Sequence, residues 1–303
     1  MSRTVREAAL RCAAALLAVV GLQAQTSPID LLTLKVPPAD RRVAYGADPS
    51  QFAELRVPPG NGPFPVAIVL HGGCWSAQIE GFPPQASSLD LIAPLAAALT
   101  KSGIATWNVE FRRVGNGGGW PQTFRDVAAA SALLRALAPQ YHLDLTRVIA
   151  VGHSSGGHLA EWLASRPKLA KSSELYTRDP LPIAGVADLD GPPSLIDPDG
   201  AIERVCGDSV ELLLGGTAAQ VPERYRDASA AIPMGLRQTL FTTGGFGRAW
   251  ADLTIDFAAR ARKAGDTVTV HRLDAADHFD IINPESRFWP QVASAIGALA
   301  APR

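Results

Sequence analysis

Short apolar runs alternate with longer helix-like stretches along most of this chain of 303 residues. The runs are bounded by turn residues, as buried strands usually are, and lie at 64–70, 104–111, 147–151, 182–189, 238–243 and 267–273. The helix-like stretches lie at 89–102, 123–137, 155–165, 250–264 and 287–299. This alternation predicts an α/β fold with a mostly parallel sheet and helices on both faces. In such sheets, ligands bind outside the carboxyl ends of the strands.

Two segments depart from the alternation. Residues 25–50 are rich in proline and charge and have weak periodicity, so we expect a lead-in segment that wraps over the domain. Residues 191–236 contain several prolines and the pair Gly215 and Gly216. They indicate a cap-like insertion over the strand ends, after the run at 182–189, which is counted as the sixth strand. Because no repeat or linker divides the rest, we expect residues 25–303 to form one domain.

The run at 147–151 leads directly into a glycine-rich turn, GHSSGGH from Gly152 to His158, and then into a helix-like stretch. This strand, turn and helix are the context of a G-x-S-x-G nucleophile elbow. Gly152 and Gly156 suit such a turn because a side chain at either place would collide with neighbouring backbone. Ser154 is therefore the candidate nucleophile, at a helix amino end that favours developing negative charge. The alternative is an ordinary helix-opening turn.

A second glycine pair follows the run at 64–70, in the sequence HGGCW from His71 to Trp75. The backbone N–H groups of Gly72 and Gly73 are unobstructed there. Together with the amide of Ser155, they are expected to hold the oxyanion that forms when the serine attacks a carbonyl. Loss of one such donor costs about 3 to 4 kcal/mol in the transition state. The alternative is a simple turn at a strand end.

Six histidines could act as the general base, and their positions in the chain distinguish them. His278 follows the last predicted strand and comes after the serine, as the Ser, acid, His order of nucleophile-elbow enzymes requires. His153 and His158 flank the serine within its own turn and are poorly placed to reach its hydroxyl. We expect His278 to take the proton of Ser154 and to return it to the leaving group. The alternative is a capping histidine on an exposed loop.

The acid that should orient His278 is less obvious. Enzymes of this type usually carry it just after the strand that precedes the histidine loop, and Gly247 occupies that place. Asp190 ends the preceding predicted strand and is our first choice for the acid. Asp252, in the first turn of a predicted helix, is the second, and another acid or none is the remaining possibility. A turn-capping role before Gly191 is the alternative for Asp190.

Several of these motifs resemble one group of known enzymes. The HGGxW loop, the turn from Asn116 to Pro121 followed by a helix with Asp126, the GHSSGGH elbow and the segment AADHFD look like the bacterial esterase and kynurenine-formamidase-like branch of the α/β hydrolases. The likeness extends over residues 50–300 and includes the segment from Pro222 to Ser229. It implies the α/β-hydrolase fold and no cofactor, but these motifs do not specify a substrate.

The same resemblance gives Ser154 and His278 the roles of nucleophile and base, and it gives Gly72, Gly73 and Ser155 the oxyanion hole. The acid does not carry over because glycine stands where this branch has aspartate. Asp190 instead resembles the arrangement in pancreatic-type lipases, in which an aspartate after the sixth strand serves.

The first hypothesis for function is therefore a carboxylesterase-like serine hydrolase that acts on a small-molecule ester through an acyl-enzyme. One alternative is an aryl-formamidase-type amide hydrolase. A second is a noncatalytic binding protein that kept the fold and lost its acid, an idea supported only by Gly247. The net charge is -1 and no basic stretch has interleaved aromatic residues, so no nucleic-acid partner is expected.

The first residues have the layout of a signal peptide. Arg3, Arg6 and Arg11 precede an apolar run at 12–22, and small or polar residues follow around Ala24. The run of about 11 residues is shorter than the roughly 20 that cross a bilayer, so we expect a cleaved signal over residues 1–24 and no permanent span. A periplasmic or secreted protein would follow. An uncleaved amphipathic anchor or a disordered tail is the alternative.

The cysteines fit the same compartment. Of the three in the chain, Cys12 would leave with the signal, and Cys74 and Cys206 could then form one disulfide. Spacing alone does not show whether these two meet. No CxxC pair or paired-histidine spacing exists, so a structural metal is not expected. Trp75 and Trp120 are expected either near the pocket or in core and turn packing.

Overall fold

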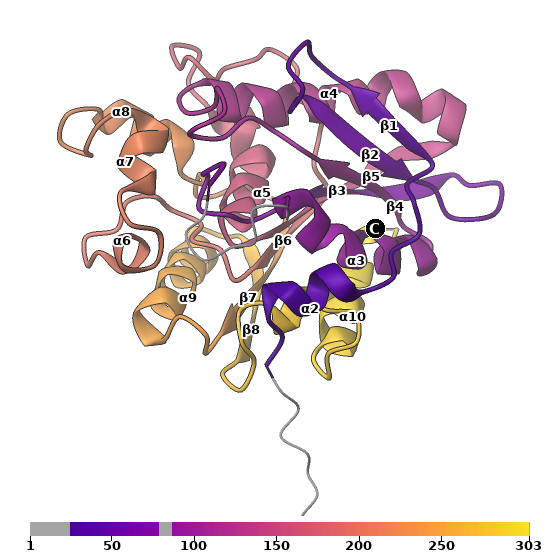
Figure 1. The fold of residues 1–303 in the computed structure, drawn as a ribbon. Coiled ribbons are helices and arrows are strands. Elements are labelled where there is room, and N and C mark those ends of the chain that lie inside the picture. The colour runs from indigo at the N-terminus through magenta and orange to yellow at the C-terminus, as the bar shows by residue number, and fades with distance from the viewer. Residues whose placement is uncertain (1–24, 79–86, 303) are drawn as a thin grey trace, which may run out of the picture.

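The computed structural model describes residues 25–78 and 87–302, and its centre is one eight-stranded sheet in the order β1-β2-β4-β3-β5-β6-β7-β8 (Figure 1). The strands are β1 (Arg41–Ala44), β2 (Phe52–Arg56), β3 (Phe64–Leu70), β4 (Ala105–Val109), β5 (Leu143–His153), β6 (Gly185–Leu189), β7 (Arg237–Thr243) and β8 (Thr267–Leu273). β2 pairs antiparallel with β1 and β4, and every other neighbouring pair is parallel. The mostly parallel sheet predicted from the alternation is confirmed.

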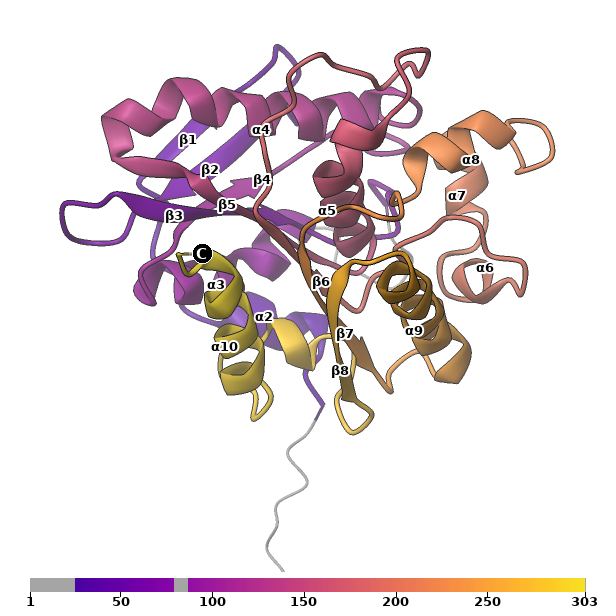
Figure 2. The same cartoon turned by 180° about the vertical axis from the view of Figure 1, so that it is seen from behind.

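Helices cover both faces of this sheet (Figures 1 and 2). One face carries α4 (Gln122–Tyr141), α5 (Ser155–Ser165) and α9 (Arg248–Lys263), and the other carries α2 (Pro28–Thr33), α3 (Ser88–Lys101) and α10 (Trp289–Ala300). β3 shows how the sequence produces two cores. Val66, Ile68 and Leu70 pack into the first, whereas Ala67 and Val69 pack into the second, because successive strand side chains point to opposite faces.

The amino-terminal part of the domain differs from the expectation. Residues 25–50 were predicted to be an irregular lead-in segment, but they contain α2 and β1, and β2 follows directly. β1 has four residues and is largely exposed, so it lacks the apolar run by which β3 to β8 were recognised, and β2 was not predicted either. α2 begins with a capping box in which Ser27 and Asp30 satisfy each other's backbone N–H groups.

Residues 191–236 lie between β6 and β7 and contain α6 (Ala201–Cys206), α7 (Ser209–Leu214) and α8 (Pro222–Ala228). The three short helices lie together beside the main body, with α6 next to α9 (Figures 1 and 2). A disulfide joins Cys206, the last residue of α6, to Cys74 after β3, across 132 residues of sequence. This bond ties the insertion to the central sheet.

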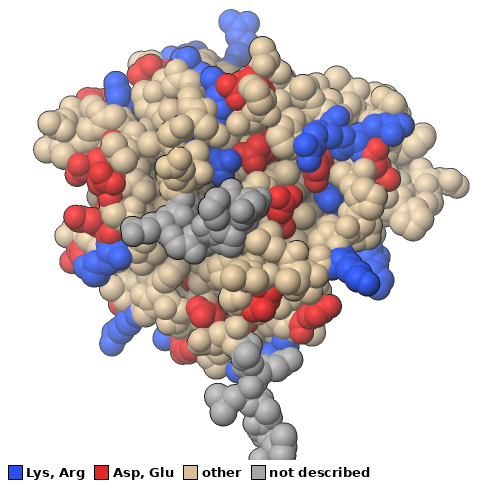
Figure 3. Space-filling view, viewed as in Figure 1, with Lys and Arg blue, Asp and Glu red and all other residues tan. Residues whose placement is uncertain are grey.

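The expected signal over residues 1–24 lies outside the described residues. In the part of the chain that is described, no helix has the length and apolar character needed to cross a membrane. Acidic and basic side chains are interspersed over the face seen in Figure 3.

Candidate active site

The turn between β5 and α5 places Ser154 at the carboxyl edge of the sheet. Ser154 has φ 56° and ψ -127°, a left-handed conformation that is unusual for a residue other than glycine. Its backbone N–H donates to the carbonyl of Leu189 at 3.0 Å, which holds the turn against β6. A Cβ atom on Gly152 would collide with the carbonyl of Gly156, so the turn needs glycine there. The tight turn between strand and helix predicted from GHSSGGH is thus present.

The loop after β3 lies directly against this serine. A Cβ atom on Gly72 would come within 3.0 Å of the Cβ of Ser154, so only glycine allows this approach without displacement. Gly72 and Gly73 line the same cavity as Ser154. Ser155 is the first residue of α5, where backbone N–H groups point out of the helix. The three predicted oxyanion residues therefore surround one side of Ser154.

The structure brings Asp190 to His278. Oδ2 of Asp190 lies 2.7 Å from Nδ1 of His278, and both side chains are buried. Thr243 adds two bonds to the same carboxylate, from its hydroxyl to Oδ2 at 2.6 Å and from its N–H to Oδ1 at 3.0 Å. Burial by itself would raise the pKa of Asp190, but the bonds from His278 and Thr243 outweigh it and lower that pKa. The carboxylate is held ionised beside the imidazole.

The turn that carries Asp190 is strained and firmly braced. Asp190 has φ 59°, again in the left-handed region. Its carbonyl accepts a bond from Nε1 of Trp250 at 3.1 Å, and the next carbonyl, of Gly191, accepts one from the hydroxyl of Thr254 at 3.0 Å. Oδ1 of Asp188 accepts the N–H of Gly191 at 2.8 Å. Two residues of α9 and one of β6 thereby hold the turn that carries Asp190.

Asp252, the second choice, does not reach this site. It lies on α9 with its side chain 43% exposed, and its carboxylate pairs with Arg248 at 3.4 Å. Gly247, at the usual place of the acid, has φ 78° and caps the start of α9. The loop after β7 instead presents Phe246, whose ring centroid lies 4.2 Å from that of His278.

The two histidines of the elbow have other partners. Nε2 of His153 donates to the carbonyl of His278 at 2.9 Å, and Nε2 of His158 donates to the carbonyl of Ala228 at 2.8 Å. Burial, and after it the nearby ring of His278, lowers the pKa of His153 to about 3. Burial lowers the pKa of His158 to about 4. Both rings are neutral at neutral pH and brace the elbow.

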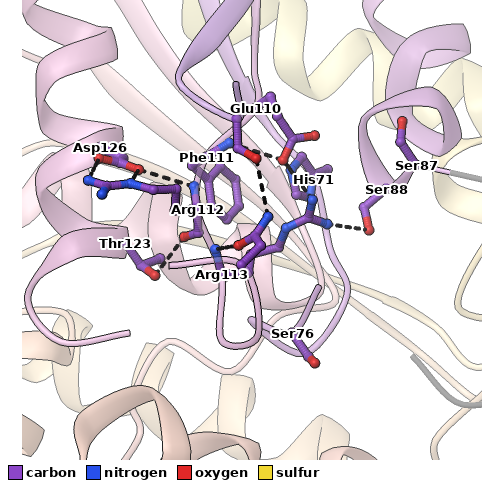
Figure 4. A network of polar contacts seen from close by, with 12 residues as sticks. His71, Ser76, Ser87, Ser88, Glu110, Phe111, Arg112, Arg113, Thr123 and Asp126 are labelled. Atoms are coloured by element: carbon purple, nitrogen blue, oxygen red, sulfur yellow. Dashed lines mark hydrogen bonds and ion pairs between the residues drawn. The ribbon is translucent and has the colours of Figure 1, made fainter. Parts of the chain in front are cut away.

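A buried charge network supports the loop after β3 from behind (Figure 4). His71 stacks on Phe111 with ring centroids 4.3 Å apart, and its Nε2 lies 3.5 Å from Oε1 of Glu110. The same oxygen accepts a bond from Arg113 at 2.8 Å, and Arg113 also donates to the hydroxyl of Ser88 at 3.1 Å. Burial would raise the pKa of Glu110, but His71 and Arg113 outweigh it and the pKa is lowered. This network fixes the residue that precedes the glycine pair.

A second ion pair in the same view involves Asp126, which the resemblance had singled out. The guanidinium of Arg112 donates to both of its carboxylate oxygens, each at 2.8 Å (Figure 4). Asp126 is buried at the start of α4 and fastens that helix to the chain after β4. Its role in the structure is to hold the fold together.

Ser154 and His278 open into one cavity of about 260 Å³. Its walls are mainly apolar, and the lining residues come from the glycine loop, α3, the elbow, α6, the loop after β7 and the histidine loop. Trp75 and Trp120 are not among the described residues that line it. Trp75 is buried and donates to Nδ1 of His158 at 3.1 Å, whereas Trp120 donates to Glu174 at 2.9 Å. Of the two expectations for these tryptophans, packing in the core or in a turn is confirmed.

Sequence reasoning missed three residues that shape the site, namely Thr243, Phe246 and Trp250. Thr243 ends β7, Phe246 lies in the loop that follows, and Trp250 lies in the first turn of α9. The missing carboxylate at position 247 was a signal that this loop is built differently. The sequence nevertheless does not show which neighbours a threonine or tryptophan will contact.

Solved structures share this architecture at low sequence identity. Esterase B from Lactobacillus rhamnosis, in an inhibited form, has a TM-score of 0.73 and 19% identity over 98% of this chain and 96% of that chain. A bacterial heroin esterase has a TM-score of 0.67 and 20% identity over 89% and 86%. A bifunctional GH43-CE protein from Bacteroides eggerthii has a TM-score of 0.67 and 18% identity over 85% of this chain, which spans only 37% of that longer protein. These likenesses confirm the α/β-hydrolase fold.

No curated protein gives a significant sequence match. A family model does match, over residues 55–234, which is more than half of the chain and includes the glycine loop, the elbow and Asp190. The chain therefore belongs to the BD-FAE family.

Proposed function

We propose that this protein is a serine hydrolase that cleaves small-molecule carboxylic esters through an acyl-enzyme. In this proposal Ser154 is the nucleophile, His278 the general base and Asp190 the orienting acid. The observation that carries it is the 2.7 Å contact between Asp190 and Nδ1 of His278, at a histidine that lines one cavity with Ser154.

The arrangement supports a two-step reaction. In the neutral imidazole whose Nδ1 donates to Asp190, Nε2 is the acceptor and can take the proton of Ser154 as Oγ attacks the ester carbonyl. The amides of Gly72, Gly73 and Ser155 would hold the negative oxygen of the tetrahedral intermediate. The imidazolium then protonates the leaving alcohol as the C–O bond breaks. A water molecule, activated by the same histidine, releases the acid and restores Ser154.

Two further observations favour esters. The similar solved structures include several that are named esterases, one of them in a tributyrin phosphonate-inhibited form. The cavity at Ser154 has mainly apolar walls, which suits an uncharged acyl group. The noncatalytic alternative rested on Gly247 alone, and the contact between Asp190 and His278 favours the hydrolase over it.

The test is hydrolysis of p-nitrophenyl acetate and butyrate by the wild type and Ser154→Ala, with fluorophosphonate labelling in parallel. We expect turnover and labelling by the wild type and loss of both in the variant, by about a millionfold in kcat. A wild type that neither turns over any ester nor labels would contradict the proposal. Turnover of an aryl formamide in preference to these esters would move the substrate class to amides.

We also infer that the protein works outside the cytoplasm, with residues 1–24 as its export signal. The disulfide between Cys74 and Cys206 supports this because such bonds persist in oxidising compartments. Amino-terminal sequencing of the exported protein should find a start after Ala24. Recovery of the intact amino terminus from the cytoplasm would contradict it.

A further inference from the structure

Three consecutive residues of the loop that faces Ser154 have left-handed backbone. Gly73, Cys74 and Trp75 have φ values of 115°, 49° and 55°. Glycine adopts such a conformation freely, but the other two residues do so only when their surroundings hold them in place. The position of the Gly73 amide therefore depends on whatever anchors the two residues that follow it.

Trp75 is anchored in the core. Its side chain is buried, Nε1 donates to His158 at 3.1 Å, and its carbonyl accepts the N–H of Val114 at 2.9 Å. Cys74 is anchored in a different way, by its covalent bond to Cys206 at the end of α6. The loop is thus held on one side by the core and on the other by the insertion.

The same bond also places a wall of the cavity. Val205, next to Cys206, lines the cavity together with Cys74, Ser154 and His278. α6 has only six residues, and of these Ala201 and Ile202 are buried while the rest are exposed or half-buried. The end of α6 that faces the cavity, with Val205 and Cys206, is therefore only partly buried against the core.

Val205 and Phe246 separate this cavity from a second, outer groove of about 390 Å³ between α6 and α9. Both residues line both spaces. A movement of the end of α6 would consequently join the cavity to the groove and enlarge the space beside Ser154.

We propose that Cys74 and Cys206 are positioning residues for the hydrolase site, and that Val205 sets the size of ester that the site accepts. This inference rests on the proposed function. The disulfide fixes the oxyanion loop and the end of α6 together, so that breaking it affects turnover of every ester and also the preference among esters of different size.

The experiment compares the wild type, oxidised and reduced, with Cys206→Ser. Dithiothreitol converts the bond to two thiols and is itself oxidised to its cyclic disulfide. Substrates are p-nitrophenyl esters from acetate to octanoate, and acetates of p-nitrophenol and 1-naphthol. We expect kcat for the acetate to fall about tenfold or more on reduction, because small misplacement of a donor is costly. Reoxidation should restore kcat in the wild type and not in Cys206→Ser.

Two further variants retain the disulfide. They distinguish an effect on the position of Val205 from an effect on folding. Val205→Ala should raise kcat/KM for the bulkier esters relative to p-nitrophenyl acetate by about threefold or more. Val210→Ala is the matched control, because Val210 lies in the same insertion but lines a different cavity. It should leave that ratio unchanged. If Cys206→Ser does not fold, the reduced wild type still tests the role of the disulfide, and the two valine variants still test the role of Val205.

The inference is overturned if reduced, folded protein keeps the kcat and the ester preference of the oxidised form, or if Val205→Ala and Val210→Ala behave alike. Circular dichroism establishes that the reduced protein is folded. An oxidised wild type that is inactive on every ester would instead contradict the proposed function, so the two failures are distinguishable.

Discussion

Oδ2 of Asp190 lies 2.7 Å from Nδ1 of His278, a residue 88 positions later in the sequence. The contact joins the end of β6 to the loop after β8, across the end of β7 that lies between them in the sheet. Thr243, the last residue of β7, donates to the same carboxylate. At the end of β7, near the place where the resemblance implies an acid, the chain thus provides a hydrogen-bond donor to Asp190.

Thr243→Val removes the hydroxyl that donates to Asp190 at 2.6 Å. A hydrogen bond to a charged group contributes about 1.5 to 3 kcal/mol, so we expect kcat to fall roughly tenfold. This bond lowers the pKa of Asp190, so its loss should move the acid limb of the pH–rate profile to higher pH.

Thr242→Val is the control for that experiment. Thr242 is equally buried, but its hydroxyl has no hydrogen-bond partner among the described residues. Its loss should leave the pH–rate profile unchanged. Equal effects of the two substitutions would mean that the bond to Asp190 has no special role.

Phe246→Ala removes the ring that lies over His278 at 4.2 Å and lines the cavity. Phe246 is 38% exposed, so we expect little change in Tm but a rise in KM of about threefold to tenfold. Leu212→Ala, at an exposed leucine on α7, should change neither quantity. A drop in Tm without a change in KM would show that the ring only packs.

Glu110→Gln breaks the buried pair with Arg113 and leaves a cation without its partner. Loss of one member of a buried pair costs about 3 to 5 kcal/mol of unfolding free energy. The pKa of Glu110 is lower in the folded protein than in the unfolded chain. Its contribution to the free energy of unfolding is therefore present above the pKa that Glu110 has in the unfolded chain, and it is lost as the pH falls. Urea unfolding should show that the wild type and Glu110→Gln differ greatly in free energy of unfolding near neutral pH and less in acid. A difference independent of pH would contradict this.

Glu161→Gln should stabilise the protein, whereas Glu110→Gln destabilises it. Glu161 on α5 is fully buried and neither carboxyl oxygen has a hydrogen-bond partner among the described residues. Burial, followed by the charges of Asp188 and Asp266, raises the pKa of Glu161. The contribution of Glu161 to the free energy of unfolding is therefore present at low pH and is lost as the pH rises. The variant should therefore have a higher Tm than the wild type in mild alkali. Thermal unfolding should show this gain disappear below the unfolded pKa of glutamate, and a variant less stable at every pH would contradict it.

The sequence predicted the parts of this structure that depend on local pattern. β3 and β8 have the predicted bounds, because continuous apolar runs between turn residues mark buried strands. The turn at Ser154 could also be predicted, because it requires glycine at positions 152 and 156. β1 was missed because its exposed residues carry no apolar period.

What local pattern did not determine were contacts between distant segments. The choice between Asp190 and Asp252 depended on which carboxylate the fold carries to His278, and the meeting of Cys74 with Cys206 depended on the path of residues 191–236. Both required the three-dimensional arrangement of segments far apart in the chain. Order along the chain favoured Asp190 and Asp252 as candidates for the acid, and only the contact of Asp190 with His278 distinguishes them.

The most direct test of the central claim is kcat for p-nitrophenyl butyrate in Asp190→Asn beside Asp252→Asn, both checked for folding by circular dichroism. We predict that Asp190→Asn lowers kcat about ten-thousandfold, as loss of the acid from a serine triad does, while Asp252→Asn stays within about twofold of the wild type. Near-normal turnover by a folded Asp190→Asn, or a large loss in Asp252→Asn, would contradict the triad of Ser154, His278 and Asp190.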